Sequence, residues 1–396
     1  TKGAYRFFDS PEVTHETLQK VHNENVVEIA GASSRMVLFI QDGSELIYNQ
    51  YRCTSMALGL QLMRSGRESC FIRVLAVEWS KDSPAVTIGV AKQTAWIRPE
   101  PSEETKSNDQ KEKESLVRLN TLKAIGRPPV NSRWVSVGDR GNDIYAYISG
   151  ATDEGWDYAL RAKHDRIILV DGEKKRLHKW VGSLEPKGRY ELDLRARGEK
   201  FSRQAELKIT WGEAVMQPSN GKKGKAVDVT YVRAYDPEDE DPEWILTTSL
   251  KVNSVEGALG IVQIYEQRWI IEEYHKCLKT GCRIEDAQLK AGKRLLALLG
   301  ILGVVATQLL KLRDLGRQQP DRLAEELVEK EIVDIVKKKF TLTGEISLKE
   351  LWRRIAMMGG FLGRKSDGNP GWQTIWKGRL HIQDMLEGMA LVKNCG

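Results

Sequence analysis

Two aspartates occupy the same kind of position in this sequence, just after a short apolar run. Asp42 follows Met36–Ile40, and Asp139 follows Arg133–Val137. In open α/β sheets, metals and ligands bind outside the carboxyl ends of such strands. One aspartate at such a point is commonly a turn or cap residue. A shared acidic site therefore needs a third carboxylate from elsewhere in the chain.

The third carboxylate is Glu272, on a helix that we predict to begin after Ser254. The Ser254 hydroxyl can cap the first turn, and Glu256 in that turn suits the positive end of the helix dipole. An apolar row with seven-residue spacing is made of Ile264, Ile271 and Leu278. This pattern is typical of a helix with one side packed against a core.

A second, polar row runs beside the apolar one on the same helix. Its members are Tyr265, Arg268, Glu272 and Lys279. At about 100° per residue, these positions fall within an arc of about 60°. A phenol, a guanidinium, a carboxylate and an ammonium therefore share one ridge. The ridge is either a surface ion-pair stripe, which contributes little stability, or a functional surface, and the pattern alone leaves both open.

The elements around these residues predict an α/β sheet followed by helices. Further strand-like runs lie at Ile72–Glu78, Ala85–Trp96 and Tyr158–Ala162, and Asp143–Ile148 looks helical. Strands that alternate with helices indicate an α/β fold. Residues 165–243 hold short β-like stretches separated by Gly, Lys and Arg, which we interpret as a β-rich insertion. After residue 254 the pattern is almost wholly helical.

Composition bounds the class of protein. Of 396 residues, 41% are apolar and 29% charged, which excludes a disordered chain and a membrane bundle. The longest apolar run, Leu295–Ala306, is too short to span a bilayer. The five cysteines form no C-x-x-C pair, which fits a reducing cytoplasm and argues against structural zinc. A net charge of +6 permits nucleic acid as a partner without requiring it.

A family resemblance changes the weight of these observations. Residues 264–281 (IYEQRWIIEEYHKCLKTG) resemble the Y-x2-R-x3-E-x6-K signature of bacterial cut-and-paste DDE transposases of the insertion-sequence-four family. Further matches follow in the family's order: Gly3–Phe7, the Asp42 strand, Gly138–Ile144, Trp244–Ser249, Met358–Phe361 and Trp372–Trp376. The resemblance covers essentially the whole chain, and the signature helix is its most specific part.

The resemblance implies an α/β fold. Its parts are an RNase H-like mixed sheet, a β-rich insertion before the glutamate helix and a C-terminal helical dimerisation region. We accordingly expect the first part of the catalytic core over residues 1–163 and the insertion over 164–250. The second part of the core is expected over 251–315, and the dimerisation region over 316–396.

The resemblance also implies that Asp42, Asp139 and Glu272 form a metal-binding catalytic triad. Gaps of 97 and 133 residues separate them along the chain. Two Mg²⁺ ions, or Mn²⁺ in their place, about 3.5–4 Å apart can stabilise both the attacking and the leaving oxygen of a phosphodiester. Carboxylate oxygens suit Mg²⁺, and the sequence lacks a His or Cys cluster that would favour zinc.

Roles in DNA binding follow from the same resemblance. Arg268 and Lys279 are expected to hold phosphates, and Tyr265 to donate a hydrogen bond to the same strand. Trp244 matches an aromatic residue that accepts a base flipped out of the duplex, while a core aromatic at a strand start is the alternative. Other expected DNA contacts are His275, Lys276, Arg140 and Lys365. We expect Asp143 to cap the helix that follows it.

The implied activity is that of a transposase acting as a homodimer on double-stranded DNA in the bacterial cytoplasm, with no membrane partner. It would nick transposon ends, form a hairpin through the released 3′-hydroxyl, and join the ends to target DNA. In the family, a helical region that makes end-specific contacts precedes the segment matched by Gly3–Phe7. Because this chain begins two residues before that segment, we expect this form to have lost most end-specific binding.

Two alternative functions stay open on the sequence. One is a non-catalytic, truncated regulator that inhibits full-length transposase by mixed dimerisation, since inhibition needs only the dimerising helices. The other is a structure-selective nuclease with the same fold and no strand transfer. Both alternatives keep the fold assignment.

Overall fold

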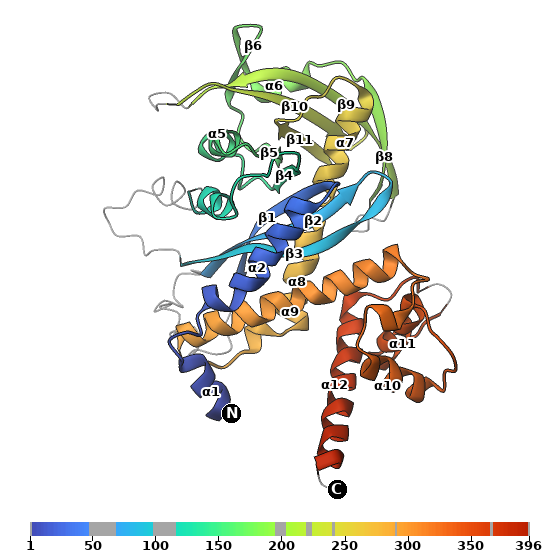
Figure 1. The fold of residues 1–396 in the computed structure, drawn as a ribbon. Coiled ribbons are helices and arrows are strands. Elements are labelled where there is room, and N and C mark those ends of the chain that lie inside the picture. The colour runs from blue at the N-terminus through green and yellow to red at the C-terminus, as the bar shows by residue number, and fades with distance from the viewer. Residues whose placement is uncertain are drawn as a thin grey trace.

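The computed structural model describes residues 2–46, 69–97, 116–194, 203–218, 224–239, 242–289, 291–364 and 367–394. A mixed 11-stranded sheet forms the centre of the molecule (Figure 1). Its first strands along the chain are β1 (Met36–Leu46), β2 (Ser69–Ser80), β3 (Ser83–Ile97), β4 (Arg133–Gly138) and β5 (Asp157–Arg161). The later strands are β6 (Ile167–Val170), β7 (Glu173–Arg176), β8 (Gly188–Leu194), β9 (Arg203–Met216), β10 (Val227–Tyr235) and β11 (Glu243–Thr248).

The part of the sheet that holds the acidic residues is built from β1 to β5. β1 pairs in parallel with β4, and β4 with β5, whereas β1, β2 and β3 form an antiparallel meander. The parallel pairing of β1 ends where Gln41 meets Gly138. The strand predicted over Met36–Ile40 is longer in the structure, because β1 continues to Leu46 by pairing with β2, with Asp42 opposite Arg73.

The predicted β-rich insertion extends this same sheet. The strand order β3-β2-β1-β4-β5-β11-β10-β9-β6-β7 places the insertion strands beyond β5, and β8 pairs with β9 off that path. β11 joins the two parts by pairing Leu246 with Arg161 of β5. The short helix α6 (Leu177–Gly182) packs on this part through buried Leu177 and Trp180. The insertion is therefore continuous with the core sheet.

Period-two alternation along β1 supplies both faces of the sheet with apolar side chains. Leu38 and Ile40 pack with α7 (Val255–Glu266), α8 (Trp269–Lys276) and α9 (Gly292–Gln318). Val37 and Phe39 pack on the other face with α2 (His15–Ala32), helical residues 116–123 and α5 (Tyr145–Asp153). By the same alternation, Asp42 faces α8, whereas Gln41 faces the opposite side.

The helix predicted after Ser254 consists of three pieces. The Gly257 N–H donates to Ser254 Oγ at 3.1 Å, so the predicted cap is confirmed. At Gln267–Arg268 the backbone N–H groups bond only three residues back, which tightens the chain between α7 and α8. After α8 the chain widens into a π-helix, Cys277–Gly281. The prediction of one continuous α-helix was thus wrong. Arg268, between α7 and α8, nevertheless keeps helical backbone angles (φ −51°, ψ −30°).

The long helix α9 is the only one among the described residues whose length and composition would allow it to cross a membrane. Its buried residues Leu295, Leu299 and Leu310 belong to the core on the α7–α8 face of the sheet. α9 also packs against β3, α2 and the N-terminal helix α1 (Lys2–Asp9). Arg294 on α9 donates twice to the Asp9 carboxylate of α1. This packing is that of a core helix.

The C-terminal helices form a third core at one end of the molecule (Figure 1). They are α10 (Lys330–Phe340), α11 (Leu348–Met358) and α12 (Trp372–Asn394), and two short 3₁₀ helices precede them at Ile284–Asp286 and Ala324–Glu326. The start of α12 docks on the π-helix, where Trp376 Nε1 donates to the Gly281 carbonyl at 2.7 Å. Its far end exposes Leu391 and Val392.

Glycines set how closely α11 and α12 approach. A Cβ on Gly378 would overlap the Ile355 carbonyl oxygen, whereas a Cβ on Gly388 would meet no atom within 4 Å. We expect Gly378→Ala to lower the free energy of unfolding by about 1–3 kcal/mol, because the crowded backbones must separate. Gly388→Ala in the same helix should instead raise it by up to about 1 kcal/mol. Urea unfolding followed by circular dichroism measures both, and equal effects would contradict this packing.

Candidate active site

A cleft of about 1060 Å³ lies beside α8, at the point where the parallel pairing of β1 with β4 ends. Its wall is mainly charged and polar. The cationic lining residues are Arg118, Arg140, Arg161, Arg268, Lys276 and Lys279. The acidic ones are Asp42, Glu45, Asp139, Glu272 and Glu273, and His275, Tyr265 and Trp372 also contribute. All three predicted triad carboxylates therefore reach one cleft.

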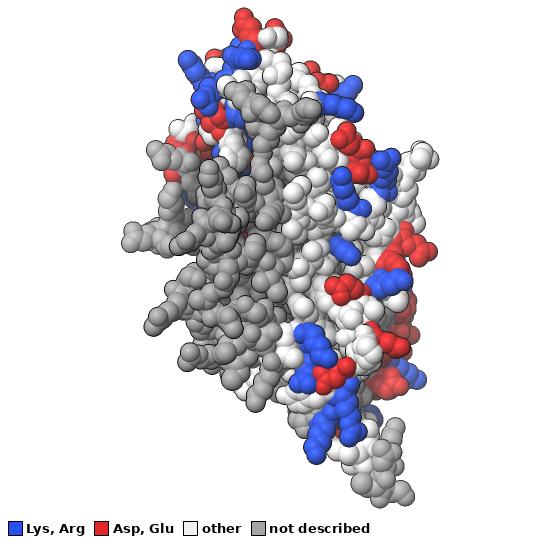
Figure 2. Space-filling model, turned by 90° about the vertical axis from the view of Figure 1, so that its left-hand side faces the viewer, with Lys and Arg blue, Asp and Glu red and all other residues white. Residues whose placement is uncertain are grey.

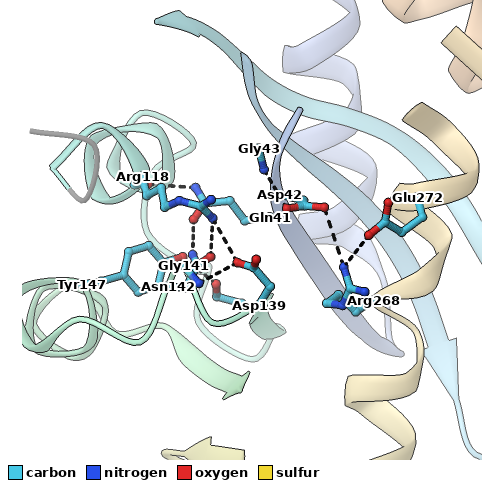
Figure 3. Close-up of polar contacts among 11 residues, drawn as sticks. Gln41, Asp42, Gly43, Arg118, Asp139, Gly141, Asn142, Tyr147, Arg268 and Glu272 are labelled. Atoms are coloured by element: carbon cyan, nitrogen blue, oxygen red, sulfur yellow. Dashed lines mark hydrogen bonds and ion pairs between the residues drawn. The ribbon is translucent and has the colours of Figure 1, made fainter. Parts of the chain in front are cut away.

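Asp42 and Glu272 meet through Arg268, as Figure 3 shows. Arg268 Nη1 lies 3.0 Å from Glu272 Oε1 and 3.7 Å from Asp42 Oδ2. The second oxygen of Asp42 accepts a hydrogen bond from the Gly43 N–H at 2.8 Å. One oxygen of each carboxylate and one ring nitrogen of His275 lie within 4.8 Å of one another. The alternation of β1 and the turn before α8 thus place two carboxylates from distant segments together.

Asp139 sits on the other side of Asp42 and is held by a network of its own (Figure 3). Asp139 Oδ1 accepts from the Gly141 N–H at 2.9 Å and from Arg118 Nη1 at 3.4 Å. Arg118 also donates to Asn142 Oδ1 at 2.6 Å, and Asn142 Nδ2 donates to Gln41 Oε1. Gln41 Nε2 closes the ring by donating to the Arg118 carbonyl at 2.8 Å. Asp139 is therefore fixed from the sheet side opposite α8.

Sequence reasoning missed this network. Gln41 and Asn142 lie inside the quoted strand and the Gly138–Ile144 segment, yet nothing in those motifs assigns them a role. Arg118 stands in no motif at all. A side chain at position 141 would lie 2.8 Å from Arg118 Nη2. The glycine there is the one local signal that a guanidinium packs closely against this loop.

The carboxyl group of Asp42 is electrostatically strained. Burial, together with the negative charges of Asp139 and Glu272, raises its pKa to about 6, against the lowering influence of Arg268 and Arg118. A carboxylate placed among other carboxylates is stabilised by an added cation. A cleft with three carboxylates fits a hard divalent ion, which takes oxygen ligands.

The signature ridge is preserved in spite of the broken helix. Tyr265, Arg268, Glu272 and Lys279 all line the cleft. Burial raises the pKa of Tyr265, so its hydroxyl keeps its proton at neutral pH. The Lys279 ammonium lies 3.7 Å from Glu285 Oε1. The predicted ridge thus forms part of the cleft wall, and two of its members, Arg268 and Glu272, form an ion pair.

Of the other residues predicted to contact DNA, some line the cleft and some do not. Arg140 and Lys276 line it at exposed positions. His275 lines it too but is buried, and burial, with the nearby cations Arg73 and Lys279, holds its pKa well below its ordinary value. Trp244 is half-buried on β11, does not line the cleft, and packs edge-on against the Tyr265 ring at 5.6 Å. Lys365 lies outside the described residues.

Asp143 does not cap the helix after it, contrary to the prediction. The cap position of α5 is Ile144, with no side-chain hydrogen bond. Asp143 is fully buried, and its Oδ2 accepts from the Lys163 and His164 N–H groups at 2.6 and 3.0 Å. It also forms an ion pair with Arg166. A buried carboxylate needs several donors, and the loop after β5 supplies more than a helix start would.

Comparison with protein families agrees with this fold and site. The transposase DDE domain matches residues 112–307, which include β4 to β11, α7 and α8, so the fold is that of the RNase H-like core of a DDE transposase, a class that uses divalent metal ions. The transposase Tn5 dimerisation domain matches residues 304–395, which include α10 to α12. Together the matches extend over most of the chain. The chain belongs to the Tn5-like DDE transposases.

The charge of Asp42 gives a stability prediction for the metal-free protein. Because folding raises its pKa from 3.8 to about 6, the wild type loses stability as pH rises through that window. Without divalent ions, Asp42→Asn should raise the free energy of unfolding at pH 7.5 by on the order of 2–3 kcal/mol. The gain should vanish below about pH 3, where Asp42 is protonated in both the folded and the unfolded state. Urea titrations at both pH values measure it.

The matched control is Asp153→Asn, at an exposed position near the end of α5. We expect its effect to stay within about 0.5 kcal/mol at both pH values, as for most surface substitutions. An Asp42→Asn variant that is less stable than wild type at pH 7.5 would show that Arg268 and Gly43 compensate the buried charge fully.

Proposed function

We propose that this chain cuts transposon ends by metal-dependent hydrolysis, forms a hairpin intermediate and transfers the ends into target DNA. The observation that carries the proposal is the meeting of Asp42 and Glu272 at Arg268, in the cleft that also holds Asp139. Water attacks the phosphodiester at the transposon end and releases a 3′-hydroxyl. That hydroxyl then attacks a phosphodiester of the opposite strand, which breaks and releases the flanking DNA with a free 3′-hydroxyl. Water opens the resulting hairpin and regenerates the 3′-hydroxyl of the transposon end. This hydroxyl attacks a phosphodiester of target DNA, which breaks to leave a target 3′-hydroxyl.

Asp42, Asp139 and Glu272 are the proposed ligands of two Mg²⁺ ions, with Mn²⁺ as a substitute. When bound, such ions supply positive charge that stabilises the attacking and leaving oxygens of an in-line displacement. The elevated pKa of Asp42, about 6, supports this assignment because the carboxylates need a counter-charge. Arg118 and the Gly141 N–H hold Asp139 at the cleft wall.

Cationic side chains of the cleft are proposed to position the DNA backbone. Arg268 can grip a phosphate with two N–H groups, and Lys279 acts as a point charge beside it. The Tyr265 hydroxyl is proposed to donate a hydrogen bond to the same strand. Arg140 and Lys276, at exposed positions of the lining, would extend the contact along the duplex.

The cations of the cleft, rather than those on the face drawn in Figure 2, are proposed to contact the phosphates. On the face drawn in Figure 2, the described Lys and Arg side chains are interspersed with Asp and Glu. Phosphate contacts then depend on cations gathered at the site itself. The proposed partners are transposon-end and target DNA in the cytoplasm. We propose a homodimer assembled through α10 to α12 on that DNA.

Loss of Glu272 tests the activity directly. With Mg²⁺ or Mn²⁺ and a duplex that carries the element's own end, Glu272→Gln should lower the cleavage rate at least about a hundredfold, because removing a direct ligand costs more than removing its neighbours. The control Glu256→Gln, exposed in the first turn of α7, should cleave within about twofold of wild type. Cleavage and joined products are separated on denaturing gels.

The alternative functions give different products in the same assay. A wild-type chain that cuts without joining DNA would be a structure-selective nuclease. A chain that does not cut but suppresses a related active transposase on mixing would be a regulator acting through the dimerisation region. Either result would overturn the proposed activity.

Trp244 is proposed to stack on a base flipped from the transposon end. Since stacking contributes about 1–3 kcal/mol per base, Trp244→Ala should slow hairpin formation about tenfold or more. Trp244→Phe should retain most of the rate, because it keeps an aromatic face and the packing on Tyr265. First-strand nicking should stay within about twofold in both variants. An equal loss of nicking and hairpin formation would assign Trp244 to folding alone.

A further inference from the structure

His275 occupies an unusual position in the cleft. It lies one turn after Glu272 on α8 and is only 6% exposed. Among the described residues, its Nε2 atom is buried without a hydrogen-bond partner. A buried polar atom left unpaired costs about 1–3 kcal/mol, so a helix residue that serves only to pack would be better apolar. The imidazole therefore calls for a partner that the described part of the chain does not supply.

The surroundings of the ring indicate what that partner is. One ring nitrogen lies within 4.8 Å of a carboxylate oxygen of both Asp42 and Glu272. Those two carboxylates are separated only by the Arg268 guanidinium. Two acids and an imidazole converging on one point form the donor set of a divalent cation.

We propose that His275 is a ligand of the metal ion held by Asp42 and Glu272, which makes this position a mixed nitrogen and oxygen site. The proposal rests on the metal site of the proposed function. Asp139, which is held by Arg118 on the other side of Asp42 and is not one of the three clustered ligands, would serve an all-oxygen position. The two metal positions of the cleft are then chemically unequal.

The ligand set determines which ion prefers the mixed position. Mg²⁺ takes oxygen ligands and gives up its waters reluctantly. Imidazole nitrogen adds affinity for Mn²⁺ and more for Co²⁺. The mixed position should therefore bind Mn²⁺ more tightly than Mg²⁺, while the all-oxygen position discriminates less.

Electron paramagnetic resonance of Mn²⁺ bound to the whole chain, without DNA, tests the ligation. Electron spin-echo envelope modulation should show coupling to ¹⁴N in the wild type, and ¹⁵N-labelled histidine should replace it with ¹⁵N coupling. His275→Asn should lose the nitrogen coupling and weaken Mn²⁺ binding about tenfold or more. Mg²⁺ binding, measured by competition, should change less.

Two matched variants complete the experiment. His381→Gln, at an exposed position of α12, should keep the coupling and the Mn²⁺ affinity. Glu272→Gln should lose Mn²⁺ affinity at the same site. Because the labelled wild type reports nitrogen ligation by itself, the test does not depend on His275→Asn folding normally, which circular dichroism checks.

The outcomes separate this inference from the proposed function. Mn²⁺ that binds in a Glu272-dependent way without histidine coupling would overturn the role of His275 and leave the carboxylate site intact. Coupling that persists in His275→Asn would assign it to another histidine and overturn the inference as well. Mn²⁺ affinity unaffected by Glu272→Gln would count against the metal site of the proposed function itself.

Discussion

Repulsion between carboxylates that lie close together at one edge of the sheet is the constraint around which this molecule is organised. Asp42 is almost fully buried, and its nearest charged neighbours include two more acids. The fold keeps them together by rigid packing of β1 and α8 and by two guanidiniums, Arg268 on one side and Arg118 on the other. Burial and the two neighbouring acids raise the pKa of Asp42, so added positive charge would stabilise its carboxylate.

Because side chains along β1 alternate between the two faces of the sheet, Asp42 and Gln41 lie on opposite faces. Asp42 continues the row of Leu38 and Ile40 and so meets the helix that carries Glu272. Gln41 continues the row of Val37 and Phe39 and anchors the Arg118 network. Adjacent residues in one strand thus hold the two halves of the site. A one-residue shift of β1 would exchange them and dismantle both.

Part of the site could be predicted from local geometry, because residues one or two turns apart on a helix have fixed relative positions, whereas the meeting of Asp42, Asp139 and Glu272 was implied by the family resemblance. Local geometry suffices for Glu272 and its ridge and for the cap at Ser254. It fails where long-range contacts decide. β1 runs past Asp42 because β2 offers pairing partners, and Asp143 turns inward because donors from the loop after β5 reach it. The role of Arg118 could not be predicted, because it depends on contacts with Gln41 and Asp139 in segments distant in the sequence.

The contact between α12 and the π-helix has a consequence for how such chains can be recombined. Trp376 donates to the Gly281 carbonyl, and Trp372 packs where any side chain on Gly281 would lie. The segment that carries Lys279 therefore receives part of its support from the dimerisation domain. The two domains are therefore not independent modules. In a chimera whose last hundred residues come from a relative, those residues would have to provide a tryptophan that donates to the Gly281 carbonyl. Without it, the helical segment that carries Glu272 and Lys279 would lose a contact that supports it.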